Sequence, residues 1–291
     1  MSTSVLAFRA MGTDVRLIGP AGHPAFARAG DVVRDTFERE EHRCSRFRAD
    51  SELSNVNACA GSWTQVSAGL TRIVVAAIDA ARRTQGRFDP TVLPAVLAAG
   101  YDRDFDEVLA GARAALRPAA PCGRWEEIEI HGRRLRLPTG AALDLGGFAK
   151  GWTVDLAADA ALAAGLPWAL VNAGGDLRLG GAGPEGGIDV AVEDPEDQQV
   201  ELARLRLSHG ALATSSVTRR AWGHGMHHLI DPATGRPADG AVLQATVWAP
   251  TCAEAEVAAK DALLSGPAAV ERSAAILVLR DGEVHASLEA A

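Results

Sequence analysis

Helical and β-hairpin patterns follow one another in an irregular order along this chain, and that order constrains the fold most. Apolar residues at helical spacing predict helices over residues 29–47, 68–84, 105–116, 152–162 and 251–266. Alternating residues predict hairpins over 125–138 and 274–287, and strands over 6–19, 133–143, 168–180, 187–216 and 241–250. A doubly wound sheet needs regular strand–helix alternation, so we predict an α+β fold. We expect one domain over residues 1–291, with two interleaved lobes as the alternative.

Residues 144–151 (DLGGFAKG) form a glycine-rich turn before the helix predicted over 152–162. Gly146 and Gly147 permit close backbone approach, and the amides at a helix N-terminus attract anions. Lys150 adds a full positive charge. Together these features suit a ligand that carries phosphate. The spacing matches neither the Walker A loop nor GxGxxG, so an ordinary turn is the better explanation of this segment taken alone.

Two further segments have both a structural and a functional interpretation. Residues 171–179 (VNAGGDLRL) are either a β-bulge or tight turn in which Asp176 bonds its own backbone, or a second wall of the same cleft. In residues 86–94 (GRFDPTVLP), Gly86 is predicted at position C′ of the preceding helix, and proline holds Asp89 extended. Packing of this loop on Phe88 explains the pattern without a ligand.

Residues 227–240 (HHLIDPATGRPADG) are predicted to be a loop, because Asp231-Pro232 and Thr234-Gly235 favour turns. His227 and His228 stand at its start. A histidine here is either a hydrogen-bonded structural group or a proton carrier, since imidazole titrates near pH 7. The sequence pattern leaves both interpretations open.

The composition is ordinary for a soluble globular enzyme. A formal net charge of −8 disfavours a sequence-independent nucleic-acid binder, which needs a basic face. No stretch approaches the roughly 18 apolar residues of a membrane span, and the N-terminus lacks the features of a signal peptide. The four cysteines lack zinc spacing and are predicted to be reduced thiols. We therefore expect a cytoplasmic protein that neither binds nucleic acid nor inserts into a membrane.

Seven motifs in a fixed order resemble one family. They are AMGTDV, CSRFRADSELSNVN, GRFDPTVLP, DLGGFAKGWTVD, VNAGGDLR, LATSS and HHLIDPATGRP, and the match as a whole reaches from Met11 to about Gly266. In this order they resemble the ApbE-type flavin transferases (FAD:protein FMN transferases). DLGGFAKG, VNAGGD and HLIDPATG are the most specific.

The resemblance implies an α+β protein with mixed or antiparallel sheets, packed helices and FAD in a central cleft. It implies transfer of FMN from FAD to a threonine or serine hydroxyl of an acceptor protein, with a phosphoester bond formed and AMP released. A divalent metal, usually Mg²⁺, would lie beside the pyrophosphate. By matching position, the residues lining the FAD site would be Met11, Phe47, Arg87, Phe88, Asp89, Asp144, Lys150 and Ile230. Phe47 would stack on the isoalloxazine, and His228 would be the general base beside the reacting phosphate.

The chain departs from this family at the implied metal site. The family has an aspartate, a threonine four residues later and a backbone carbonyl, here about Gly147. This chain has Glu256 and Lys260 at the first two positions. Glutamate can ligate Mg²⁺, whereas a protonated lysine cannot. Either the Lys260 ammonium stands where the metal would, or the site has lost its metal and its activity, or the two residues are an exposed i,i+4 ion pair.

A second departure is Ser216 in ATSS, where the family commonly has glycine. The substitution would reshape the pocket wall near the flavin. These departures keep two alternative functions open besides the transferase. One is a non-catalytic FAD-binding protein, and the other is an FAD pyrophosphatase that gives FMN and AMP.

Overall fold

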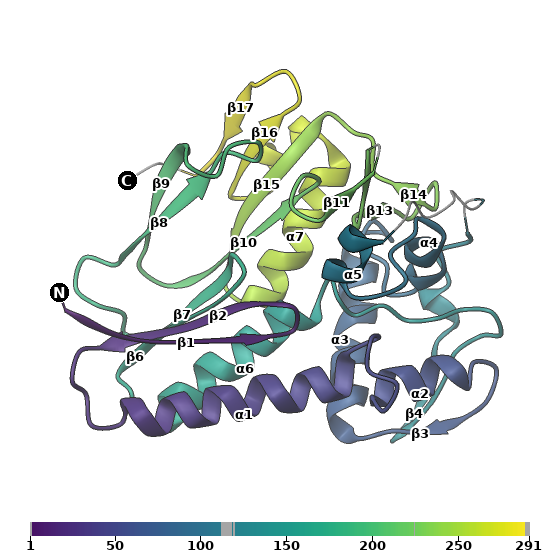
Figure 1. Cartoon of the computed structure of the whole chain (residues 1–291), viewed down its shortest axis with the longest axis horizontal. Coiled ribbons are helices and arrows are strands. Elements are labelled where there is room, and N and C mark those ends of the chain that lie inside the picture. Colours follow the sequence, from purple (N-terminus) through teal and green to yellow (C-terminus); the bar gives the residue numbers. More distant parts are fainter. Residues whose placement is uncertain (1, 112–117, 119, 224, 289–291) are drawn as a thin grey trace. The chain divides into compact units, whose positions relative to one another are not determined.

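The computed structural model describes residues 2–111, 118, 120–223 and 225–288. The chain folds into two compact units, each built from separated stretches of sequence. Unit 1 comprises Met1–Glu40, Lys150–Ser216 and Gly240–Ala291, and unit 2 comprises Glu41–Ala149 and Val217–Asp239. The helices and strands of both are labelled in Figure 1.

Unit 1 is built on an antiparallel sheet of eight strands in the order β1-β2-β6-β7-β10-β15-β16-β17. Their bounds are Thr3–Ala10, Thr13–Pro20, Trp168–Ala173, Asp176–Gly181, Gly210–Ser216, Val242–Ala249, Ala275–Leu279 and Val284–Ala286. The unit also contains α6 (Ala149–Ala163, from its second residue), α7 (Cys252–Ser265), the 3₁₀ helix η2 (Pro267–Glu271) and most of α1 (Phe26–Cys44).

The two faces of this sheet are covered differently, as the alternation of side chains along a strand requires. Ala169 and Val171 of β6 pack with apolar residues of α1 and α6. Leu170, between them in sequence, packs instead with the hairpin of β8 (Ile188–Glu193) and β9 (Glu201–Leu207). Helices therefore bury one face, and a hairpin buries part of the other.

Helix α6 meets the start of α7 at close range. A Cβ added to Gly151 would lie 2.6 Å from the carbonyl oxygen of Cys252, so only glycine fits this contact. One turn further along α6, Asp155 accepts the amides of Cys252 and Ala253 at 2.8 and 2.9 Å. These are orphan amides of the first turn of α7, so Asp155 caps that helix from outside. Glu256 and Lys260 are thereby fixed relative to α6.

Unit 2 is formed by short elements. Its helices are α2 (Glu52–Ala58), α3 (Ala68–Arg83), α4 (Leu93–Ala98), α5 (Phe105–Ala110) and the 3₁₀ helix η1 (Trp125–Glu127). A three-stranded sheet has the order β3 (Thr64–Gln65), β5 (Arg134–Arg136) and β4 (Glu129–His131). Two small hairpins pair β11 (Ala221–Trp222) with β12 (Met226–His227), and β13 (Ile230–Asp231) with β14 (Arg236–Pro237).

The structure confirms the helices at 68–83 and 252–265 and the hairpins near 129–136 and 275–286. The strand predicted over 6–19 is wrong. Met11 and Gly12 have φ values of 51° and 67°, which reverse the chain in a two-residue turn and divide the segment into the β1–β2 hairpin. The strand predicted over 168–180 is likewise a hairpin, because Gly174 and Gly175 turn β6 into β7.

Other boundaries also differ from the sequence predictions: the strand predicted over 133–143 ends at Arg136, and the helices predicted over 29–47 and 152–162 span 26–44 and 149–163. Residue C′ of α3 is Gln85 (φ 54°), not Gly86, since Gln85 donates to Arg82 and Gly86 to Ala81 as in a Schellman motif. The loop predicted over 227–240 contains the β13–β14 hairpin, whose turn is closed by a bond from Gly235 to Asp231. Of the helix predicted over 105–116, the structure shows α5 to Ala110, and residues 112–116 lie outside the described residues.

Candidate functional site

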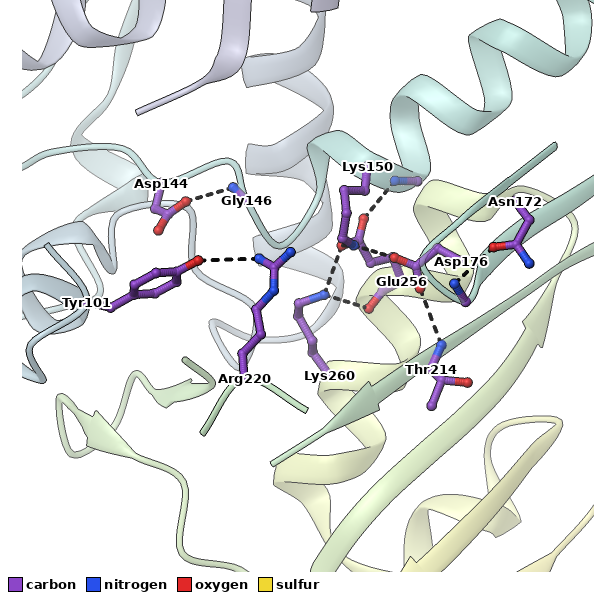
Figure 2. A network of polar contacts seen from close by, with 12 residues as sticks. Tyr101, Asp144, Gly146, Lys150, Asn172, Asp176, Thr214, Arg220, Glu256 and Lys260 are labelled. Atoms are coloured by element: carbon purple, nitrogen blue, oxygen red, sulfur yellow. Dashed lines mark hydrogen bonds and ion pairs between the residues drawn. The ribbon is translucent and has the colours of Figure 1, made fainter. Parts of the chain in front are cut away.

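Two polar clusters, one in each unit, contain some of the residues singled out from the sequence, among them Phe47, Asp144, Lys150 and Glu256. The charge cluster of unit 1 consists of Lys150, Asp176, Glu256 and Lys260. The aromatic–arginine cluster of unit 2 consists of Arg46, Phe47, Tyr101, Asp144 and Arg220. Figure 2 shows the contacts of the charge cluster and, from the aromatic–arginine cluster, the contact between Tyr101 and Arg220.

The charge cluster brings together three segments that are distant in sequence. Lys150 is the second residue of α6, Asp176 is the first of β7, and Glu256 and Lys260 lie one turn apart on α7. The Lys150 ammonium bonds Oδ2 of Asp176, and Oε1 of Glu256 at 2.8 Å. Lys260 Nζ lies 3.3 Å from the same Oε1, and the Gly151 amide donates to Oε2 at 2.9 Å. Glu256 thus accepts from two ammonium groups and one amide.

These charges are buried, so their mutual interactions control their ionisation. Burial raises the pKa of Glu256, but the charges of Lys150 and Lys260 outweigh it and lower that pKa to about 2. Burial lowers the pKa of Lys150, whereas Asp176 and Glu256 outweigh this effect and raise it. For Lys260 the effect of burial prevails and its pKa is lowered. The Asp176 pKa is raised by burial, with a further contribution from Glu256.

Asp176 fits neither interpretation of the VNAGGDLRL segment fully. The segment is a tight turn, because Gly174 and Gly175 both have positive φ and Asn172 Oδ1 accepts the Gly175 amide at 2.9 Å. The Asp176 carboxylate, however, does not bond its own turn. It faces Lys150 and also accepts the amide of Thr214 at 3.4 Å. The turn therefore delivers a carboxylate to the charge cluster.

Mg²⁺, which the resemblance implies, does not fit the residues of the charge cluster. Mg²⁺ needs oxygen ligands close to octahedral geometry, and an ammonium group offers none. The Glu256 oxygens already accept hydrogen bonds from Lys150, Lys260 and Gly151. Among the described residues, no group of three or more His, Cys, Asp or Glu side chains converges as a metal site. Gly147, the other implied ligand, belongs to unit 2.

The aromatic–arginine cluster is organised around the guanidinium of Arg46. Its central carbon lies 4.1 Å from the ring centroid of Phe47 and 4.5 Å from that of Tyr101. Its Nε lies 3.3 Å from Oδ2 of Asp144. Arg220 completes the cluster, with Nη1 3.5 Å from the Tyr101 hydroxyl. Cation–π contacts and one ion pair therefore fix the orientation of the guanidinium.

Two features of this cluster distinguish it from a packed core. The Arg46 side chain is only 7% exposed, and its Nη2 has no hydrogen-bond partner among the described residues. Phe47 is 44% exposed although its ring lies against the guanidinium. A buried donor without an acceptor is costly, so its presence beside an exposed aromatic ring indicates a place for a ligand. The buried ring of Tyr101 packs against that of Phe47, and burial raises the pKa of the Tyr101 hydroxyl.

The glycine-rich turn is held by contacts within unit 2. Asp144 Oδ1 accepts the amide of Gly146 at 2.7 Å, and a Cβ added to Gly146 would lie 2.9 Å from that oxygen. Asn57 exchanges two hydrogen bonds with the backbone of Leu143, at 2.9 and 2.7 Å. The Ala149 amide donates to Leu145. The proposed role of the turn amides in holding a pyrophosphate stays a prediction, and several of these amides already have protein acceptors.

The loop over 86–94 has the structural features expected without a ligand. Asp89 is buried, and its carboxylate accepts from Thr91 through the amide at 2.7 Å and the hydroxyl at 2.6 Å. The Gly123 amide donates to its other oxygen at 2.6 Å. Phe88 is buried with its ring centroid 5.8 Å from that of Phe148, and Arg87 is partly exposed. Their predicted contacts with FAD are not tested by this arrangement.

The two adjacent histidines, His227 and His228, lie in different surroundings. His227 is buried, with Nε2 2.9 Å from the Ala238 carbonyl oxygen and Nδ1 accepting the Leu229 amide at 3.3 Å. Both of its ring nitrogens are engaged, so it is a structural histidine. His228 is partly exposed, and its amide donates to the carbonyl of Arg220, a member of the aromatic–arginine cluster.

The remaining predicted residues lie in different surroundings. Ile230 is buried in an apolar group with Tyr101 and residues of α4. Met11 occupies the positive-φ turn between β1 and β2, in unit 1. A non-glycine residue in this conformation stores strain, and such strain is common at functional sites.

The sequence analysis did not assign Arg46, Tyr101 or Arg220 to a site, and it left Asp176 between a turn and a cleft wall. Arg46 adjoins Phe47 in the motif CSRF, and Asp176 ends VNAGGD, so proximity to a recognised motif was the available signal. Tyr101 and Arg220 lie outside the quoted motifs, and only the fold brings them together.

Known proteins with similar sequences agree with one another. The model of the ApbE family matches residues 11–281. A Rhodobacter capsulatus protein named FAD:protein FMN transferase is 32% identical over 279 residues, which cover 91% of this chain and 53% of that protein. A Vibrio cholerae protein of the same name is 31% identical over 237 residues, covering 79% of this chain and 71% of that protein. The chain therefore spans about half the length of the Rhodobacter relative.

Solved structures confirm the predicted α+β fold. The ApbE protein of Thermotoga maritima superposes with a TM-score of 0.87 at 24% identity, covering 98% of this chain and 97% of that one. The flavin transferase ApbE from Vibrio cholerae superposes with a TM-score of 0.82 at 28% identity, with the same two coverages. In the part of the chain that the structure describes, no helix has both the length and the apolar character needed to cross a membrane.

Proposed function

The chain belongs to the ApbE family, and we propose that it acts as an FAD:protein FMN transferase. The reaction attaches FMN from FAD through a phosphoester to a threonine or serine hydroxyl of an acceptor flavoprotein, and AMP leaves. The observation that carries the proposal is the aromatic–arginine cluster, with a half-exposed ring and a buried guanidinium nitrogen that has no acceptor among the described residues. A flavin offers a planar ring system and carbonyl oxygens, which match these two features.

Within unit 2, the proposed flavin contacts divide into stacking and polar groups. Phe47 presents its ring to the isoalloxazine, and Arg46 donates from Nη2 to a ring oxygen or nitrogen. The ion pair with Asp144 prevents the guanidinium from turning away. Met11, Arg87, Phe88, Asp89, Lys150 and Ile230 remain proposed as further residues of the FAD site.

In the transfer step, the acceptor hydroxyl oxygen attacks the phosphorus of the FMN half of FAD. A new P–O bond forms as the bond to the bridging oxygen breaks, and that oxygen leaves with AMP. The hydroxyl proton passes to a general base, for which we propose His228, because both ring nitrogens of His227 are engaged. The step depends mainly on positioning and charge stabilisation.

The proposal is tested by incubating the purified chain with FAD and an acceptor flavoprotein domain. The Vibrio cholerae relative, incubated with FAD and the same acceptor, is the positive control. We expect a flavin-fluorescent acceptor band and one AMP per flavin attached. His228→Ala is expected to slow transfer roughly 10²–10⁴-fold. His42→Gln, a change at a histidine whose side chain is 52% exposed, is the matched control and should not slow it.

A second candidate is a non-catalytic FAD-binding protein, which the two ammonium groups paired with Glu256 favour because they occupy an oxygen that the implied metal would need. It predicts FAD binding with neither AMP nor a labelled acceptor, in a reaction where the positive control is active. Equal amounts of free FMN and AMP without a labelled acceptor would instead indicate an FAD pyrophosphatase.

A further inference from the structure

The pair formed by Glu256 and Lys260 is buried rather than exposed. The two side chains are only 2% and 14% exposed, and Lys260 Nζ lies 3.3 Å from both Oε1 and the backbone carbonyl of Glu256. The alternative of an exposed i,i+4 pair is therefore wrong. An exposed pair contributes little, whereas a buried cation fixed beside a carboxylate changes which ions that carboxylate can bind.

The charge cluster is electrically balanced by its own residues. Two ammonium groups face two carboxylates, so its formal charge is zero when all four are ionised. A divalent cation would raise that charge to about +2 in a buried place, and like charges at such distances repel strongly. It would also have to displace hydrogen bonds to both oxygens of Glu256. Binding is opposed both by charge and by the loss of these bonds.

The two lysines differ in their contacts, and Lys260 rather than Lys150 is the candidate to replace a metal ion. Lys150 bridges Asp176 and Glu256, and so links β7 to α7 through α6. Among the described residues Lys260 forms hydrogen bonds only with Glu256, and these use two of its three N–H bonds. The remaining N–H can donate to an anionic ligand.

We infer that the Lys260 ammonium is a built-in cation that replaces a divalent metal beside Glu256. The chain consequently binds no divalent cation at this position. The inference deepens the proposed function: if that function holds, FMN transfer proceeds in the presence of EDTA, on a charge carried by the protein. The absence of a metal site does not itself depend on the transfer activity, so the two can fail separately.

Removal of the Lys260 charge should uncover a cation site. In Lys260→Thr the cluster keeps two carboxylates and one ammonium, so its formal charge becomes −1. The substitution also adds a hydroxyl oxygen one helical turn from Glu256, and hydroxyl and carboxylate oxygens suit hard cations. Lys260→Arg keeps the charge and is the matched control.

The test is titration with Mn²⁺, with free Mn²⁺ measured by electron paramagnetic resonance and each variant's fold checked by circular dichroism. Glu256→Gln is included, and only binding that this change abolishes is assigned to the cluster. We expect no such binding by the parent chain or Lys260→Arg, with or without FAD. We expect Lys260→Thr to bind Mn²⁺ at least tenfold more tightly than the parent.

Binding of Mn²⁺ by the parent that Glu256→Gln abolishes would overturn the inference. So would a folded Lys260→Thr that binds no more tightly than Lys260→Arg. If Lys260→Thr does not fold, the parent titration decides alone: Glu256-dependent binding overturns the inference and its absence supports it. A chain that binds neither Mn²⁺ nor FAD would refute the proposed function and leave this inference standing.

Discussion

Both polar clusters bury cations beside carboxylates, yet they differ in how completely their groups are paired. In the charge cluster of unit 1, each carboxylate accepts from at least one ammonium and one amide. In the aromatic–arginine cluster of unit 2, Arg46 has a buried nitrogen without a partner among the described residues, beside a half-exposed ring. A buried donor without an acceptor is costly, and a ligand is one way to supply the acceptor that Arg46 Nη2 lacks among the described residues. The comparison supports the proposal that the aromatic–arginine cluster of unit 2 takes part in flavin recognition, whereas the charge cluster of unit 1 holds a fixed arrangement of charges.

The largest expected effect comes from breaking the paired cluster. Glu256→Gln leaves two buried ammonium groups with Asp176 alone, and we expect the free energy of unfolding to fall by about 3–5 kcal/mol. Chemical denaturation measures this change. Glu254→Gln, at an exposed position of the same helix, should cost within about 1 kcal/mol. Equal losses in the two variants would mean that the charge cluster is not a closed network.

The next effect contrasts an acid that lies beside lysines with an acid that lies beside carboxylates. Glu256 has its pKa lowered by lysines, whereas burial, followed by Asp89 and Asp231, raises the pKa of Cys122 in unit 2 from 9.0 to about 11. Because the thiolate is the reactive form, alkylation of Cys122 by iodoacetamide at pH 9 should be roughly 50-fold slower in the folded than in the unfolded chain.

The pH dependence separates ionisation from simple shielding of Cys122. The rate in the folded chain should keep rising about tenfold per pH unit from pH 8 to pH 10, while the rate in the unfolded chain levels off near pH 9. A raised folded-state pKa contributes stability that is complete below pH 9.0 and is lost as the pH rises towards about 11. Mass spectrometry of the peptide gives both rates; parallel profiles would contradict the shift.

The third effect concerns Arg46 of the aromatic–arginine cluster. Arg46→Met removes the donor that we propose faces the flavin, and a hydrogen bond from a charged group contributes about 1.5–3 kcal/mol. The Kd for FAD, measured by quenching of flavin fluorescence, should therefore rise at least about tenfold. Arg48→Met is the control, because Arg48 is exposed and pairs with Asp50 on the surface. If both variants bind FAD like the parent, flavin recognition does not use this cluster.

Local patterns predicted much of the fold and little of either cluster. Helical spacing predicted α3 and α7, and the four-residue separation placed Glu256 and Lys260 on one face of α7. The same spacing is compatible with an exposed or a buried pair. Burial is decided by Lys150, which lies 106 positions from Glu256 in sequence, and by the turn that delivers Asp176. Such partners follow from the tertiary fold, which single-sequence patterns do not encode.

The sequence patterns also failed to predict positive φ angles at residues other than glycine. Met11 and Gln85 both have positive φ, but neither residue type favours it. The sequence therefore predicted one strand in place of the β1–β2 hairpin, and placed residue C′ of α3 at the neighbouring Gly86. The two residues also provide a comparison between the units: Met11 is a proposed flavin contact, and Gln85 ends a helix at an exposed position.

The smallest effect compares the backbone strain at Gln85 with that at Met11. Gln85→Gly relieves a left-handed conformation that costs roughly 1–2 kcal/mol for an ordinary residue, offset by the entropy of glycine in the unfolded chain. We expect a net gain of about 0.5–1 kcal/mol in denaturation experiments and an unchanged Kd for FAD. Met11→Gly should relieve similar backbone strain but weaken FAD binding, because it also removes a proposed contact. If Met11→Gly binds FAD like Gln85→Gly, the strain at Met11 serves the hairpin alone, and flavin recognition is confined to unit 2.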